Sequence, residues 1–355
     1  MSQTRGLFSR EGRRVSPASV IGPAMIDRRT ALFGTLVLGV AAGAGAQTRS
    51  PATLDSPHLT WPEPSETIEL WPSGAPGAPA ILPVETVRER SNDPAYNDRY
   101  VFGISRPRMA VFRPARSNGA GVLITPGGGY NWVVIDKEGY EMARLLAARG
   151  VTAFVLFYRL PHEGWAAGPN TPLSDAQRAM RLIRSRALDY RLDPDRICAM
   201  GFSAGGHLCA DLLTRFSART YDPVDAADLL SARPDLAAPI YPVVSMTLPT
   251  AHAGSRRNLV GDNASHERER AYSPHLNVRN DAPATFLVHA EDDASVVVEN
   301  SLMLRAALLA AKVPVETHLF ADGGHGFGLR LAKGKTVEGW EELFFAWARK
   351  KGLFA

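Results

Sequence analysis

Segments rich in apolar and β-branched residues alternate along the chain with segments of helical periodicity. The first kind predicts strands, at residues 67–71, 85–89, 109–113, 121–125, 151–158, 197–200, 239–244, 284–290 and 315–320. The second kind predicts helices, at residues 137–149, 173–189, 204–213, 297–312 and 336–351. Strands that alternate with helices are joined by right-handed crossovers. The pattern therefore predicts an α/β fold with a mostly parallel central sheet and helices on both of its faces.

Two segments depart from this alternation. Residues 245–281 form a long, mostly irregular insertion, which we expect to lie as a small cover over one end of the sheet. Residues 47–66 are rich in Pro, Ser and Thr and have no periodicity, so they predict a linker or N-terminal arm. We expect residues 67–355 to form a single domain.

Residues 1–46 have the features of an export signal. The sequence DRRT at residues 27–30 resembles a twin-arginine motif, and an apolar, Gly-containing run over residues 31–46 ends in the small residues AGA. That run is shorter than the roughly 20 residues that span a bilayer. We therefore expect a cleaved signal, a periplasmic or secreted protein, and no stable membrane insertion after cleavage. The signal is complete from Met25, so the start at Met1 or at Met25 stays open.

The distribution of charge excludes one class of partner. The chain has 40 basic and 36 acidic residues. Six arginines and two acids lie in residues 1–46, which leaves 34 residues of each sign in the remainder. A formally neutral remainder predicts no nucleic-acid binding.

The chain has two cysteines, Cys198 and Cys209. They lie on a predicted strand and on the predicted helix that follows it, which places them at different depths below the turn between these elements. We therefore expect two buried thiols and no disulfide.

The sequence GFSAG at residues 201–205 forms that turn. A G-x-S-x-G turn between a strand and a helix is a nucleophile elbow, in which Ser203 sits on a strained backbone at the N-terminus of the helix. Gly201 and Gly205 leave room for the neighbouring strand and helix. A bare G-x-S-x-G also occurs by chance, but the strand before it and the helix after it favour Ser203 as a nucleophile.

Two further loops follow predicted strands, and functional sites in such sheets lie beyond the carboxyl ends of the strands. His325 lies in the glycine-rich loop after residue 320, and acidic residues follow the strand that ends at residue 290. In an acyl-transfer site His325 would take the proton of Ser203, and an acid would orient the imidazole. The residues alone leave that acid open between Asp292 and Asp293.

The sequence PGGGY at residues 126–130 follows another predicted strand. Three glycines allow backbone N–H groups to point inward, so we expect Gly128 or Gly129, together with Ala204, to form an oxyanion hole. A phosphate-binding loop is poorly supported, because the glycine spacing differs from G-x-G-x-x-G and no acid ends the next strand.

Several motifs together resemble those of bacterial α/β-hydrolase esterases, in particular the secreted, acetylxylan-esterase-like carbohydrate esterases. The motifs are PGGGY, YRLP, DAQRAMRLIRSRA, LDPDRICAMGFSAGGHLCADL, HAEDDASVVVENS and GGHGFG. The resemblance covers residues 70–353 and implies the α/β-hydrolase fold, with Ser203 as nucleophile, Asp293 as acid and His325 as base. It also implies an oxyanion hole from the glycine run and Ala204, no cofactor and no metal. The chain departs from relatives with an HGGG loop, because it has Pro126 where they have His.

The aromatic and histidine side chains near these loops suggest a substrate. Tyr130 and Trp132 follow the glycine run, and His162 and Trp165 lie on a loop expected beside the site. Aromatic rings suit the faces of sugars, although they more often pack in cores. We expect hydrolysis of short acyl esters, most of all acetyl groups on xylan or a related plant polysaccharide. The alternatives are a general short-chain carboxylesterase, an oligopeptidase-type serine peptidase and a non-catalytic binding protein.

Overall fold

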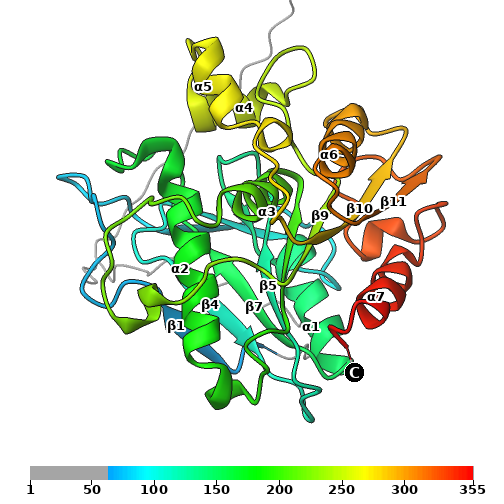
Figure 1. The fold of residues 1–355 in the computed structure, drawn as a ribbon, viewed down its shortest axis with the longest axis horizontal. Coiled ribbons are helices and arrows are strands. Elements are labelled where there is room, and N and C mark those ends of the chain that lie inside the picture. The colour runs from blue at the N-terminus through cyan, green and yellow to red at the C-terminus, as the bar shows by residue number, and fades with distance from the viewer. Residues whose placement is uncertain (1–62, 355) are drawn as a thin grey trace, which may run out of the picture. The chain divides into compact units, whose positions relative to one another are not determined.

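An eight-stranded sheet forms the centre of the computed structural model (Figure 1), which describes residues 63–354. These residues all belong to one compact unit, Asp55–Ala355. The strands, in their order across the sheet, are β1 (Glu66–Glu69), β4 (Arg108–Phe112), β7 (Thr152–Phe157), β5 (Gly121–Thr125), β8 (Ile197–Phe202), β9 (Leu236–Ile240), β10 (Ala284–Ala290) and β11 (Val315–Phe320). The pairings β1–β4 and β4–β7 are antiparallel, and the pairings from β7 to β11 are parallel. The mostly parallel sheet that the sequence predicts is therefore confirmed.

Helices cover the sheet. The main ones are α1 (Glu141–Ala148), α2 (Thr171–Ser185), α3 (Ser203–Arg215), α6 (Glu299–Ala310) and α7 (Trp340–Lys350). α2 packs against α3, and α1 meets α7 through the ion pair between Arg149 and Glu342. Every residue of β5, β7 and β8 is buried, as expected for strands covered on both faces.

Some boundaries differ from the sequence-based expectation. The strand expected at residues 239–244 lies earlier, at Leu236–Ile240, because the chain turns at Tyr241, which has a positive φ of 37°. The helix expected from residue 137 begins with a π-helical turn, Asp136–Tyr140, before α1. The last predicted helix begins only at Trp340.

A second, three-stranded antiparallel sheet was not predicted in full. It consists of β2 (Thr86–Glu89), β3 (Arg99–Phe102) and β6 (Val133–Val134). β6 directly follows the glycine-rich loop after β5, so this small sheet helps to hold that loop in place.

The insertion at residues 245–281 contains more helix than expected. Its helices are α4 (Ala253–Val260) and α5 (His266–Ala271). Side chains cap both: that of His252 accepts the backbone N–H of Ser255, and that of Ser265 accepts the backbone N–H of Arg268. Figure 1 shows α4 and α5 together beyond one end of the sheet.

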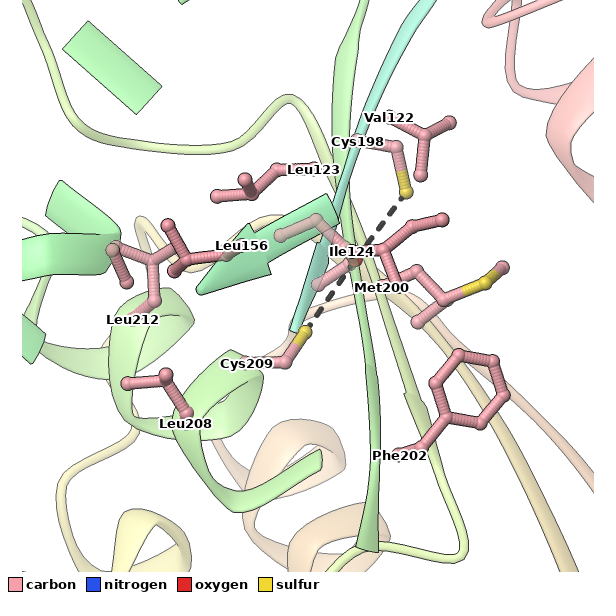
Figure 2. Close-up of a cluster of buried hydrophobic side chains, with 14 of the residues drawn as sticks. Val122, Leu123, Ile124, Leu156, Cys198, Met200, Phe202, Leu208, Cys209 and Leu212 are labelled. Atoms are coloured by element: carbon pink, nitrogen blue, oxygen red, sulfur yellow. Dashed lines mark hydrogen bonds between the residues drawn. The ribbon is translucent and has the colours of Figure 1, made fainter. Parts of the chain in front are cut away.

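The core beneath the elbow contains both cysteines. Cys198 and Cys209 are buried free thiols, and each Sγ lies 3.4 Å from the carbonyl oxygen of Ala199 (Figure 2). Burial raises the pKa of both, that of Cys209 to about 12. The prediction of two buried thiols without a disulfide is confirmed.

Nothing is described for residues 1–62. The predicted export signal at residues 1–46 therefore lies outside the described part of the chain, as does nearly all of the predicted linker at residues 47–66. Between residues 63 and 354, no helix is long and apolar enough to cross a membrane.

Candidate active site

The turn between β8 and α3 places Ser203 at the first residue of the helix. Its φ is 54°, a left-handed backbone conformation that a residue with a side chain rarely adopts. The residue is 7 % exposed, so little of it is open to solvent. This is the geometry that the G-x-S-x-G sequence predicts.

Close backbone contacts require the two glycines that flank Ser203, Gly201 and Gly205. A Cβ on Gly205 would lie 2.0 Å from the carbonyl oxygen of Thr125, and a Cβ on Gly201 would lie 2.1 Å from that of Gly205. The hydroxyl of Thr125 also donates to the carbonyl of Gly205, at 2.8 Å. The end of β5 therefore packs directly against the elbow.

His325 lies in the loop after β11 and contacts Ser203. Its Nε2 lies 2.9 Å from Oγ of Ser203, and its Nδ1 lies 2.7 Å from Oδ2 of Asp293. The side chain of Asp293 is fully buried, whereas that of His325 is 25 % exposed. The carboxylate holds the Nδ1–H tautomer, so Nε2 is free to accept the serine proton.

Asp292 and Asp293 have different partners. Oδ1 of Asp292 accepts the backbone N–H groups of Gly323 and Gly324, at 2.9 and 2.7 Å, and so fixes the base of the histidine loop. Asp293 points to the imidazole. The geometry thus separates two acids that the sequence left open.

Several groups stabilise the ionised form of Asp293. Burial alone would raise the pKa of this carboxyl, but hydrogen bonds from His289 and His325, the charge of His325 and the N–H of Val296 hold it well below its ordinary value. Nε2 of the buried His289 lies 3.3 Å from Oδ2, and Oδ1 accepts the N–H groups of Ser295 and Val296. Asp293 therefore remains a charged acceptor across the neutral pH range.

The glycine-rich loop lies beside Ser203. The N–H of Gly127 is occupied, because it donates to Oε2 of Glu138 at 3.0 Å. Among residues 63–354, no protein acceptor receives the N–H of Gly128 or of Gly129. Ala204, in the first turn of α3, also has an N–H without a partner inside the helix. These donors are available for a developing oxyanion.

The insertion holds this loop from the other side. Nδ2 of Asn258 in α4 donates to the carbonyl of Gly129, at 2.9 Å. His252 lies near Gly129, and its Nδ1 accepts the N–H of Ser255, so its Nε2 carries the proton. Burial and the charge of His325 lower the pKa of His252, which keeps it neutral at neutral pH.

Of the four predicted substrate-binding residues, two are buried. Tyr130 is 1 % exposed and its hydroxyl bonds to Nδ1 of His207, at 2.7 Å. Trp165 is 3 % exposed and lies against the guanidinium of Arg159. His162 is exposed, and no described contact joins it to Ser203 or His325.

Trp132 is half-buried and adjoins the candidate oxyanion hole. Its Cδ1 lies 2.5 Å from the point where a Cβ on Gly128 would stand. Its ring contacts Tyr100, with centroids 4.8 Å apart, and Tyr100 lies 6.3 Å from the roughly parallel ring of Phe102. Three half-buried aromatic rings thus run from the glycine loop along the small sheet.

Similarity to known proteins covers the same part of the chain. The sequence model of the BD-FAE family matches residues 109–308. Endo-1,4-beta-xylanase B of Butyrivibrio fibrisolvens is 36 % identical over 219 residues, which are 62 % of this chain and 34 % of that protein. The acetylxylan esterase of Xylanibacter ruminicola is 31 % identical over 228 residues, 63 % of this chain and 44 % of that protein. The chain thus spans between a third and a half of these two relatives.

A solved structure matches over a larger share. The acetyl ester-xyloside bifunctional hydrolase of Caldicellulosiruptor lactoaceticus superimposes with a TM-score of 0.65 and 32 % identity, covering 82 % of this chain and 98 % of that one. The family match includes more than half of the chain, and the structural match covers most of it. The chain therefore belongs to the BD-FAE family, and its fold is that of the α/β-hydrolases.

Proposed function

We propose that Ser203, His325 and Asp293 hydrolyse esters through an acyl-enzyme. Oγ of Ser203 attacks the ester carbonyl while Nε2 of His325 takes its proton. The carbonyl oxygen becomes an oxyanion that accepts N–H groups of Ala204 and of Gly128 or Gly129. The imidazolium, stabilised by Asp293, then protonates the leaving alcohol. Water deacylates the serine by the same steps, with His325 as the base.

A single observation carries this proposal: the continuous chain of contacts from Oγ of Ser203 through His325 to Asp293, at 2.9 and 2.7 Å. It is supported by the strained backbone of Ser203 and by the unpartnered N–H groups of the adjacent glycines. Strain of this kind is retained where a site needs it.

We propose short acyl groups, above all acetyl, on xylan or a related plant polysaccharide as the substrate. The names of the relatives support this choice, since they include an acetylxylan esterase and a xylanase. The row formed by Trp132, Tyr100 and Phe102 supports it too, because aromatic rings stack on sugar rings. The helices of the insertion have 8 and 6 residues, so the described chain offers no long apolar lid helix for a long acyl chain.

The proposed substrate is tested by acetate release. Wild type and Ser203→Ala are compared on acetylated xylan and on simple esters of increasing acyl length. We expect release from both substrates by the wild type and loss of roughly 10⁶-fold in the variant, because the three residues act as a unit. Turnover of simple short esters alone would leave a general carboxylesterase, and activity of Ser203→Ala would refute the mechanism.

We also propose export to the periplasm by the twin-arginine-type signal at residues 1–46. The support is the sequence alone. Replacement of Arg28 and Arg29 together by Lys is expected to retain the protein in the cytoplasm, and cell fractionation measures this. Unchanged export would contradict the proposal.

A further inference from the structure

One buried carboxylate beside the site takes no part in the steps above. Glu138 is 3 % exposed. Its Oε2 accepts the N–H of Gly127 at 3.0 Å, and its Oε1 accepts the hydroxyl of Tyr241 at 3.1 Å. The hydroxyl of Tyr241 in turn accepts the N–H of Gly328, at 3.2 Å. These bonds join the glycine loop after β5 to the histidine loop after β11.

Glu138 lies in close contact with the reacting part of the molecule. A Cβ on Gly127 would lie 2.5 Å from Oε2 of Glu138 and 2.9 Å from Cβ of Ser203. A Cβ on Gly326, next to His325, would lie 3.5 Å from Oε1. The carboxylate therefore occupies the space between the two loops that flank Ser203. A Cβ at residue 127 would also lie 2.8 Å from the backbone oxygen of Phe202, so the glycine there is required by backbone as well.

Both partners are held by uncommon backbone conformations. Glu138 stands in the π-helical turn Asp136–Tyr140, and single π turns in helices are frequent at functional sites. Tyr241 has a positive φ of 37°, which places its ring 5.4 Å from the imidazole of His325, edge to face. A π-helical turn and a residue with a positive φ thus meet at one hydrogen bond, and strain such as that of Tyr241 persists where the surrounding structure fixes it.

Glu138 forms no direct ion pair with a described residue. In residues 63–354, no Lys, Arg or His side chain lies within 4.0 Å of its carboxylate. Asp136, two residues earlier in the same turn, pairs with Arg99 at 2.8 Å. Burying a carboxylate on neutral donors is costly, and a hydrophobic residue of similar volume would usually be more stable. Stability alone therefore does not account for Glu138.

We propose that Glu138 is a positioning residue, which acts with Tyr241 to fix the oxyanion loop relative to His325. By binding the N–H of Gly127, it directs the next N–H groups, those of Gly128 and Gly129, toward the site of the oxyanion. Through Tyr241 and Gly328 it holds the loop that carries His325. The inference rests on the proposed function, because it assumes that Ser203 is the nucleophile.

The test compares Glu138→Gln with Tyr241→Phe on p-nitrophenyl acetate in the full chain. The amide of Gln has the size of the Glu138 carboxylate, but its NH2 group would face either the N–H of Gly127 or the hydroxyl of Tyr241, both of which donate to the carboxylate. We expect kcat to fall roughly 10- to 100-fold, since small displacements of reacting groups cost that much, with KM changed less than about twofold. Tyr241→Phe is expected to lower kcat in the same way. The double variant should lose no more than the larger single loss, because the two residues act as one unit.

Asp136→Asn is the matched control, because it alters a second buried acid of the same turn that contacts Arg99 instead of Gly127. We expect it to lower the melting temperature at least as much as Glu138→Gln does, with kcat within about threefold of wild type.

Equal losses of kcat in Asp136→Asn and Glu138→Gln would assign the effect to the turn as a whole and overturn the inference. Wild-type kcat in both Glu138→Gln and Tyr241→Phe would overturn it as well. If Glu138→Gln does not fold, Tyr241→Phe alone decides. Activity in Ser203→Ala would instead refute the proposed mechanism, so the two failures are distinguishable.

Discussion

Oδ2 of Asp293 lies 2.7 Å from Nδ1 of His325, whereas the carboxylate of the preceding residue, Asp292, binds only the backbone of the histidine loop among these contacts. Adjacent acids thus have separate tasks: one faces the imidazole, and the other shapes the loop that carries it. This difference gives opposite expectations for two conservative substitutions.

Asp293→Asn is expected to lower kcat by roughly 10⁴-fold, because the amide would favour the wrong tautomer of His325. Asp292→Asn should keep kcat within about tenfold and lower the free energy of unfolding by about 1–3 kcal/mol, through weakened bonds to Gly323 and Gly324. Steady-state kinetics and urea unfolding measure both. The reverse ranking of kcat would move the acid role to Asp292.

A methyl group at Gly205 would meet a backbone oxygen at 2.0 Å. Gly205→Ala is therefore expected to prevent stable folding, or to abolish activity in whatever folds, since backbone cannot move aside as a flexible side chain can. Gly261→Ala is the control: its φ is 93°, but a Cβ there meets nothing within 4 Å. It should cost only about 1–3 kcal/mol of backbone strain and leave kcat unchanged. Soluble expression, circular dichroism and activity distinguish the two. A fully active Gly205→Ala would contradict the tight packing of the elbow.

A half-buried acid away from the site, Glu141, makes stability depend on pH. A cavity of about 780 Å³, whose lining includes Glu141, Arg330 and Arg99, contains none of the three proposed catalytic residues. Burial raises the pKa of Glu141 to about 7, although Arg330, at 3.0 Å, opposes the rise. Between the ordinary pKa of a glutamate, about 4.3, and this value, the folded state binds more protons than the unfolded state. The free energy of unfolding contributed by Glu141 therefore falls as pH rises through that interval.

Glu141→Gln tests this sign. Urea unfolding of wild type and variant between pH about 5 and about 8 should show that the wild type loses stability relative to the variant as pH rises. All other titrating groups are shared, so the difference between the two curves isolates Glu141. A constant difference across this range would show that its pKa is ordinary.

The aromatic row predicts a selective effect on substrates. Tyr100→Ala and Phe102→Ala should lower kcat/KM on acetylated xylo-oligosaccharides by about 2- to 13-fold, the loss expected for one stacked ring, of roughly 0.5–1.5 kcal/mol. Their kcat/KM on p-nitrophenyl acetate should not change, because the small ester does not reach these rings. Equal losses on both substrates would mean that the rings only support the fold. Retained activity on both would mean that sugars bind elsewhere.

The alternation of strands and helices and the elbow could be predicted from local patterns. Buried parallel strands give apolar runs, and the turn at Ser203 needs glycines at fixed spacing. Both features can therefore be recognised from residues that are close together in the sequence. The small sheet is different, because β6 has only two residues and pairs with a strand more than thirty residues earlier. Such pairing has no local signal.

The role of Glu138 could not be predicted for a related reason. In the sequence it reads as one polar residue at the start of a helix of ordinary periodicity, and a π-helical turn leaves no separate mark in that pattern. The burial of Tyr130 and Trp165 could not be predicted for a similar reason: an aromatic residue in a loop gives no sign of whether it faces solvent or, like Tyr130, bonds to a buried histidine. Exposure is decided by chain segments that are distant in the sequence.

The two buried thiols next to Ala199 can report the separation of β8 from α3. Cys198 belongs to the strand that enters the elbow and Cys209 to the helix that leaves it, and neither has access to solvent. A thiol reagent can reach them only when these two elements separate. The alkylation rate of the folded protein therefore measures how often β8 and α3, the two elements that carry Ser203, separate, without any added label.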